Sequence, residues 1–273
     1  VFYLKGFVGS NYQDRQWKAP DDSVYTKKHK ERFRWLANRN WSVWTQEFKA
    51  LSATSYRVQG TKKVRVKNVQ ASRKYQYQPY FGMTNAGSML KKGHDSTLQN
   101  EWYAVKKDTT YRMIEMKDMD YLTIQTLAQL EARQSQKEIS DYLESEWTYR
   151  EFVKEEYLTI PKEFQHFFTQ QIKKNVQTMS VQEKATMIRQ YLLDLTDGNE
   201  ETADDFTDQN YADPILAFLQ KQRAGGSASY ASAGTLLFRY LGVPARYVEG
   251  YVSLPESMNS TAADTQTDEE TDG

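Results

Sequence analysis

The chain has 273 residues, enough for one large domain or two of ordinary size. Its 36 basic and 36 acidic residues cancel, so it lacks the basic excess typical of nucleic-acid-binding proteins. No apolar run approaches the roughly 18–20 residues of a membrane span, which excludes a free-standing membrane protein but not a soluble part of one. Cysteine is absent, which excludes disulfides, thiolate metal sites and a thiol nucleophile in this sequence. Because the first residue is Val1, no signal peptide can be read.

The first part of the chain shows mainly the pattern of β-strands. In Val64-Arg65-Val66-Lys67-Asn68-Val69, apolar and polar residues alternate, which is typical of a half-buried strand. We expect strands over residues 2–8, 64–69, 75–78, 102–105 and 111–114, the last two forming a pair, and one or two helices within residues 23–50.

From about residue 120 the apolar spacing becomes helical. Phe164, Phe167, Phe168, Ile172 and Val176 follow the period of one amphipathic helix. Ser180-Val181-Gln182-Glu183 fits the capping box that begins another helix. Residues 197–208 hold six acidic and no basic residues, and we interpret them as a solvated loop.

These patterns predict an α+β protein. We expect a β-rich domain over 1–120, a mainly helical domain over 121–254, and an acidic disordered linker over 255–273. The last segment has no large apolar residue after Met258, so it cannot bury enough surface to offset the entropy cost of ordering.

The segment from Asp213 to Val252 is the most informative. It predicts a short helix around 215–219, a glycine turn at 223–226, a helix over 227–241 and a strand over 247–252. The residues at 228–234 are small apart from Tyr230, so we expect the N-terminal end of the second helix to be buried. Gly242 is placed as a helix C-cap, with Pro244 just beyond.

A double glycine that leads into a helix N-terminus has two interpretations. The first amides of a helix have no intrahelical acceptor and favour negative charge, so Ser227 could mark a site that stabilises an anion. Alternatively, Gly225-Gly226-Ser227 is only a turn followed by an N-cap serine. Spacing alone leaves both open.

The order of these residues resembles the core of the transglutaminase-like superfamily, papain-related Cys-His-Asp enzymes that include predicted bacterial cysteine proteases. The matching positions are Gly225, Tyr230, Ala231, Ser232, Ala233, Leu241, Gly242, Val243, Pro244, Ala245, Arg246, Tyr247, Val248, Gly250 and Tyr251. Asp213 to Leu219 is similar to the short helix that precedes the family nucleophile. The resemblance implies a papain-like fold, with Ser227 where the family has its catalytic cysteine. It also implies that the amides of Gly226 and Ala228 support the negative charge that develops in the reaction.

The opening residues add a second resemblance. Tyr3-Leu4-Lys5-Gly6-Phe7-Val8, followed by Tyr12 and Trp17, is similar to the start of the extracytoplasmic part of multi-pass bacterial members. This implies a position on the outer face of a cell membrane, anchored through segments outside this chain. The implied partners are peptide or protein substrates, with no nucleic acid. No metal-ligand cluster, phosphate loop or cofactor fingerprint is present, so no cofactor is expected.

The chain also departs from the family pattern. A serine hydroxyl is a weak nucleophile unless a base removes its proton. The family base is a histidine that follows the nucleophile, whereas His29, His94 and His166 all precede Ser227. We therefore expect an acyl-transfer protein for peptide or side-chain amides that is inactive in this form. The alternative is a non-catalytic binding or scaffold module at the cell surface. Serine hydrolase chemistry is disfavoured, because Ser227 lies in no G-x-S-x-G elbow.

Overall fold

The structure is a computed structural model of the chain. It describes residues 2–19, 38, 58–72, 74–79, 82–83, 108–116, 124–172, 176–195, 212–221 and 225–253. The expected helices within 23–50, the expected strand over 102–105, the acidic segment 197–208 and the linker over 255–273 lie outside these residues, apart from Asn38.

The change from strands to helices near residue 120 is confirmed. The elements whose bounds the structure gives before that point are strands: β1 (Phe2–Gly9), β2 (Asn11–Gln13), β3 (Gln16–Lys18), β4 (Val58–Lys67), β5 (Gln78–Pro79), β6 (Gly82–Met83) and β7 (Asp108–Met116). Helices follow, and one strand ends the series: α4 (Ile124–Glu131), α5 (Lys137–Glu156), α6 (Lys162–Gln171), α7 (Val181–Asp194), α8 (Pro214–Lys221), α9 (Ser227–Tyr240) and β8 (Tyr247–Ser253). The fold class is therefore α+β. Within the described residues, no helix is both long enough and apolar enough to span a membrane.

The chain forms two compact units. Unit 1 contains Val1–Phe7, Asp22–Leu143 and Glu249–Gly273, and unit 2 contains Val8–Asp21 and Glu144–Val248. Each unit thus joins segments that are far apart in the sequence, whereas the domains expected from the sequence are continuous. The expected boundaries at 120 and 254 stay a prediction.

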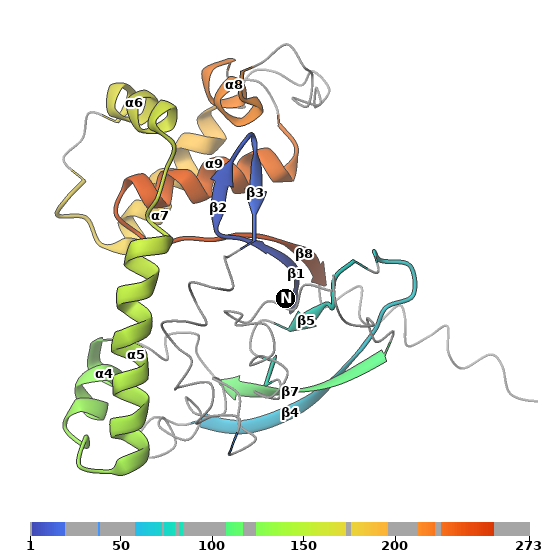
Figure 1. The fold of residues 1–273 in the computed structure, drawn as a ribbon, viewed down its shortest axis with the longest axis vertical. Coiled ribbons are helices and arrows are strands. Elements are labelled where there is room, and N and C mark those ends of the chain that lie inside the picture. The colour runs from blue at the N-terminus through green and yellow to red at the C-terminus, as the bar shows by residue number, and fades with distance from the viewer. Residues whose placement is uncertain are drawn as a thin grey trace, which may run out of the picture. The chain divides into compact units, whose positions relative to one another are not determined.

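Unit 1 is built on antiparallel strands. The long strands β4 and β7 pair from Val58↔Met116 to Lys67↔Asp108, and β6 pairs with the other edge of β7 (Figure 1). A second sheet has the order β5-β1-β8. Leu130, Ile139, Tyr142 and Leu143 form a small buried cluster from α4 and the start of α5.

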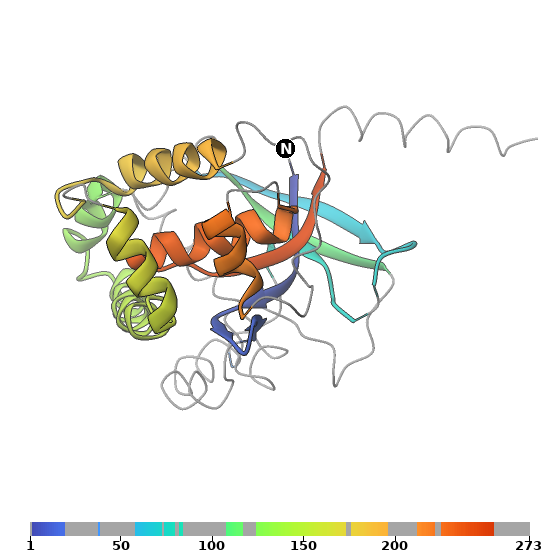
Figure 2. The ribbon, with the colours of Figure 1, turned by 90° about the horizontal axis from the view of Figure 1, so that it is seen from above.

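Unit 2 is a helical core around α9. Helices α6, α7 and α8 all contact α9, and α7 lies beside it in both views (Figure 1, Figure 2). The hairpin of β2 and β3 contributes Tyr12 and Trp17 to the same core. Its most buried large side chains are Phe164, Phe168, Phe218, Leu219, Leu236 and Leu237.

Two sequence expectations need correction. The helix that begins after Pro161 ends at Gln171, because Ile172 is extended (φ −96°, ψ 93°). Ile172 and Val176 still pack against the core of unit 2, so their apolar spacing reflects burial and not a continuing helix. Of the strand expected over 75–78, only Gln78 belongs to a strand of the structure, β5. The side-chain amide of Gln76 instead donates to the hydroxyls of Thr109 and Tyr111 on β7. By contrast, the capping box of Ser180 and Glu183 is present in full.

A buried arginine holds three distant parts of unit 2 together. Arg239 is 3% exposed, and its guanidinium donates to the carbonyl oxygens of Ala245 (2.8 Å), Thr159 (3.0 Å) and Ser10 (2.7 Å). The same group lies 5.2 Å from the ring centre of Trp17. Burial lowers its pKa to about 10, so the group stays cationic at neutral pH. Its charge is therefore offset by carbonyl dipoles and an aromatic face.

We predict that Arg239→Lys lowers the free energy of unfolding by about 3 kcal/mol. An ammonium group cannot reach three carbonyls arranged for a planar guanidinium, and each buried acceptor left without a donor costs roughly 1–3 kcal/mol. Urea unfolding measures this change. The matched control is Arg189→Lys on α7, where the side chain is exposed and the expected change is within about 0.5 kcal/mol. Equal effects of the two substitutions would contradict the role assigned to Arg239.

Candidate functional site

The helix that carries the candidate site begins one residue earlier than it would if Ser227 were the N-cap. Gly226 is the N-cap of α9 (φ −71°, ψ 170°), and no side chain caps the helix. Its carbonyl oxygen accepts from the amides of Ser229 (2.9 Å) and Tyr230 (3.3 Å). Ser227 is therefore the first helical residue, and the interpretation of Ser227 as a capping serine is wrong. Its hydroxyl is not used to satisfy the helix end.

The first turn of α9 is exposed, contrary to the expectation from its small residues. Ser227, Ala228 and Ala231 are exposed, and complete burial begins at Ser232. The reason is that the core of unit 2 includes the later turns of α9, where Ala233, Leu236 and Leu237 are buried, whereas Ser227, Ala228 and Ala231 lie on the uncovered side of the first turns. The helix therefore presents its N-terminal amides at an accessible end while its middle is fixed.

Gly225 sets the direction from which the chain enters α9. A Cβ at this position would lie 2.8 Å from two ring carbons of Phe218 and 2.9 Å from the Cβ of Ser229. Phe218 is fully buried and also packs edge-on against Tyr230, with ring centres 5.0 Å apart. Only glycine lets the backbone pass this closely. At Gly226, in contrast, an added Cβ meets nothing within 4 Å, so the space beside Ser227 is open.

The preceding helix is held by Asp213. Its Oδ1 accepts from the amides of Ile215 (2.8 Å) and Leu216 (3.0 Å), which caps α8, and Pro214 fills the first helical position. The hydroxyl of Tyr12 donates to the same carboxylate, 2.9 Å from Oδ2 and 3.1 Å from Oδ1. Burial and then the charge of Asp213 raise the pKa of Tyr12 well above its ordinary value. The β2–β3 hairpin thus fixes the helix that leads to the glycine turn.

A second contact from the hairpin reaches the buried part of α9. The indole Nε1 of Trp17 donates to the hydroxyl of Ser232 at 2.9 Å, and its ring stacks on Tyr247 with the planes 1° apart. The sequence pattern identified Tyr12 and Trp17 only through their resemblance to the family's opening residues, and it did not identify Arg239. One signal for Arg239 was available, because it is the only charged residue in the apolar second half of its helix.

The other motif residues act at the far end of α9 and in β8. Gly242 has φ +76° and follows the C-cap Leu241, which confirms its expected place at the helix end. Pro244 is exposed, and the guanidinium of Arg246 lies 5.3 Å from the ring centre of Tyr157. In unit 1, a Cβ at Gly250 would lie 1.8 Å from the carbonyl oxygen of Leu4, so this position excludes side chains. Tyr251 packs edge-on against Tyr77. The contacts of these residues are with the backbone and side chains of their own unit, so they shape the fold.

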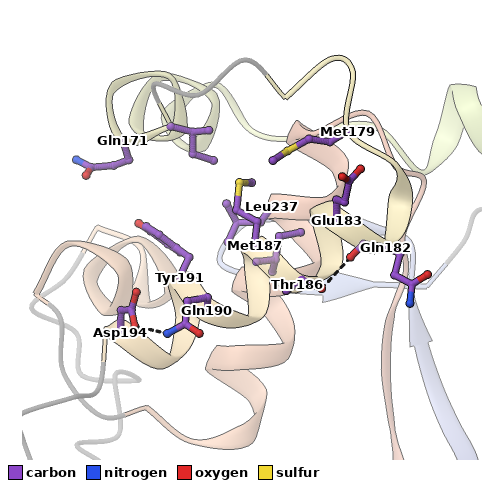
Figure 3. A pocket seen from close by; sticks show the side chains of 12 residues that line it. Gln171, Met179, Gln182, Glu183, Thr186, Met187, Gln190, Tyr191, Asp194 and Leu237 are labelled. Atoms are coloured by element: carbon purple, nitrogen blue, oxygen red, sulfur yellow. Dashed lines mark hydrogen bonds between the residues drawn. The ribbon is translucent and has the colours of Figure 1, made fainter.

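Two cavities of unit 2 lie away from the first turn of α9. One of about 640 Å³ lies between α6, α7 and α9, where Met179, Met187 and Leu237 point toward the same space (Figure 3). The other, of about 470 Å³, is bordered by the β2–β3 hairpin, Pro161 and Asp213. Neither is lined by Ser227 or by its neighbours in the first turn. The candidate site is thus an exposed helix end.

The structure brings no histidine to Ser227 among the residues it describes. His166 lies on the exposed side of α6, with its Nε2 2.9 Å from the side-chain nitrogen of Gln170, while His29 and His94 fall outside the described residues. No group of three or more histidine, aspartate or glutamate residues that could hold a metal ion occurs in the described part of the chain.

We predict that Tyr12→Phe lowers the free energy of unfolding by about 2 kcal/mol below pH 10, since the bond to Asp213 is lost. The pKa of Tyr12 is raised in the folded state, so its stabilising effect is complete below the unfolded pKa of about 10 and declines above it. The difference between wild type and variant should therefore shrink above pH 10 by about 1.4 kcal/mol per pH unit. Urea unfolding from pH 8 to 11 measures it, and comparison at equal pH cancels the other tyrosines. A constant difference would contradict the assignment.

Comparison with known proteins gives one match, to a family model. Residues 166–269 match the family model of the transglutaminase-like superfamily. The match begins within α6 and includes all of α7, α8, α9 and β8. No curated protein and no solved structure gives a significant match. Over residues 166–269, the chain is therefore similar to the core of the transglutaminase-like superfamily.

Proposed function

We propose that the chain is an acyl-transfer protein of the Cys-His-Asp class for peptide or side-chain amides, with Ser227 at the nucleophile position. One observation carries the proposal: Ser227 is the first residue of α9, exposed, with open space beside Gly226. In the active form of such a site, a thiolate attacks the amide carbonyl. The amides of Gly226 and Ala228 then stabilise the oxyanion, and a histidine protonates the leaving amine.

The chain as it stands lacks two of these groups. Ser227 supplies a hydroxyl in place of a thiol, and no histidine follows it in the sequence. General acid–base transfer contributes roughly 10²–10⁴-fold, and the members of a triad are not additive. We therefore propose that this chain does not hydrolyse amides. The absence of a cysteine at the nucleophile position favours a second candidate function, a non-catalytic binding or scaffold module that keeps the fold.

We further propose that the protein lies on the outer face of a bacterial cell membrane and meets peptide or protein partners there. This rests on the resemblance of the opening residues, from Tyr3 to Trp17, to extracytoplasmic members of the superfamily. Fusion of the natural protein to alkaline phosphatase, which is active only outside the cytoplasm, tests it. An inactive, stably expressed fusion would count against this location.

We predict that Ser227→Cys creates a thiol with a pKa about one unit or more below that of an ordinary exposed cysteine, because the α9 N-terminus stabilises the thiolate. The measurement is the rate of alkylation by iodoacetamide against pH. The matched control is Thr186→Cys, since Thr186 is exposed in the middle of α7 and is far from a helix end. Equal midpoints for the two thiols would show that the helix end has no such effect.

We predict that neither this chain nor its Ser227→Cys variant turns over a peptide amide. With p-nitrophenyl acetate, Ser227→Cys should release one equivalent of p-nitrophenolate and keep the acetyl group as a thioester, because no base activates water for its release. Added imidazole should speed hydrolysis of the acetyl thioester in Ser227→Cys. Acylation no faster than in Thr186→Cys would favour the scaffold module instead. Amide hydrolysis by the unsubstituted chain would show that the nucleophile or the base is wrongly assigned.

A further inference from the structure

One face of the β4–β7 ribbon in unit 1 carries a strip of positive charge. Side chains at alternate positions of a strand share a face, so Lys63, Arg65 and Lys67 lie together. The antiparallel register adds Arg112, directly opposite Lys63, and Asp108, opposite Lys67. Lys63, Arg65, Lys67 and Arg112 are all exposed.

The charges on this strip do not cancel. Asp108 is the one acid among the described side chains of this face, residues 63, 65 and 67 of β4 and residues 108, 110 and 112 of β7. It is bound to Arg65, whose Nε lies 2.8 Å from its Oδ1, and this guanidinium holds the pKa of the Asp108 carboxyl below its usual range. The face therefore keeps an excess of three positive charges, and Lys63 and Arg112 stand opposite each other although like charges in such a pair repel.

The packing of the opposite face of the ribbon fixes the register of β4 against β7. Val64 and Val66 are half-buried, and Tyr111 is buried and donates to the carbonyl oxygen of Tyr77 at 3.0 Å. A shift of one residue in the pairing would turn the basic residues onto the packed side and the valines outward. The packing of Tyr111 and the valines therefore keeps the cations together on the accessible side.

We infer that this basic strip binds a surface of anionic phospholipid headgroups. The strip is about 14 Å long from Lys63 to Lys67 at about 3.4 Å per residue, and its cations lie in two adjacent rows, so several phosphates of one surface can be met at once. Single-stranded nucleic acid is a poorer fit, because the described side chains of this face include no aromatic ring on which bases could stack. The inference goes beyond the proposed acyl transfer and does not depend on Ser227.

The test is co-sedimentation of the full chain with vesicles of phosphatidylglycerol and phosphatidylcholine, against vesicles of phosphatidylcholine alone. We expect binding only to the anionic vesicles, and binding that weakens steeply as sodium chloride rises from 0.05 to 0.5 M, because exposed charges are screened. A basic residue near an anionic surface contributes about fivefold in affinity. The triple variant Lys63→Gln, Lys67→Gln, Arg112→Gln should therefore bind roughly 100-fold more weakly.

The matched control removes the same charges elsewhere. Lys154→Gln, Lys162→Gln, Arg189→Gln takes two lysines and one arginine from exposed positions on α5, α6 and α7, so both triple variants have equal net charge. A second variant, Thr110→Glu, keeps every cation and adds an acid to the strip opposite Arg65, and it should also weaken binding. Circular dichroism confirms that each variant is folded.

Three results would overturn the inference. They are equal losses in the two triple variants, binding of equal strength to the neutral vesicles, and binding to a single-stranded oligonucleotide without binding to the anionic vesicles. Selective loss in the triple variant of the strip and in Thr110→Glu would support it.

Discussion

The position of α9 depends on one buried cation. Among the described residues, Arg239 has no carboxylate partner, and its guanidinium donates instead to the carbonyl oxygens of Ser10, Thr159 and Ala245. These carbonyls come from the end of β1, from the link between α5 and α6, and from the link between α9 and β8. A buried charge without such partners would be very costly. The three links must therefore bring their carbonyl oxygens to the guanidinium of Arg239. The buried guanidinium thus ties three links of unit 2 to the second half of α9.

Helix α9 is exposed at its first residue and buried in its later turns. Its later turns are locked by Arg239, by the bond from Trp17 to Ser232 and by the core, whereas Ser227 stands exposed at its first residue. A reactive group at a helix end gains from this division, because its orientation is set by the rigid part while a substrate approaches the open part. What the described residues lack at this end is a base, and a rigid frame cannot replace one.

Local sequence signals predicted the helices and most strands well, because they depend on near neighbours. The capping box at Ser180, the glycine after Leu241 and the alternation around Val64 each produced the expected element. The errors arose where tertiary contacts decide. Ile172 continues the helical spacing of α6 but packs against the core as extended chain. The small residues near Ala228 face solvent, because the core of unit 2 covers α9 fully only from Ser232 onward. The roles of Tyr12 and Arg239 depend on partners up to 229 residues away, which no local pattern can reveal.

The separation of those partners has a consequence for how the protein is made. Ser10, Tyr12 and Trp17 are synthesised well before α8 and α9, so their contacts with Arg239, Asp213 and Ser232 form only after more than two hundred further residues have been added. Closing such long loops is entropically slow, so unit 2 has a high contact order despite its helices. During that interval Tyr12 and Trp17 remain without their core. The nascent chain therefore exposes the aromatic residues of this hairpin, to which a chaperone can bind until α9 has been synthesised.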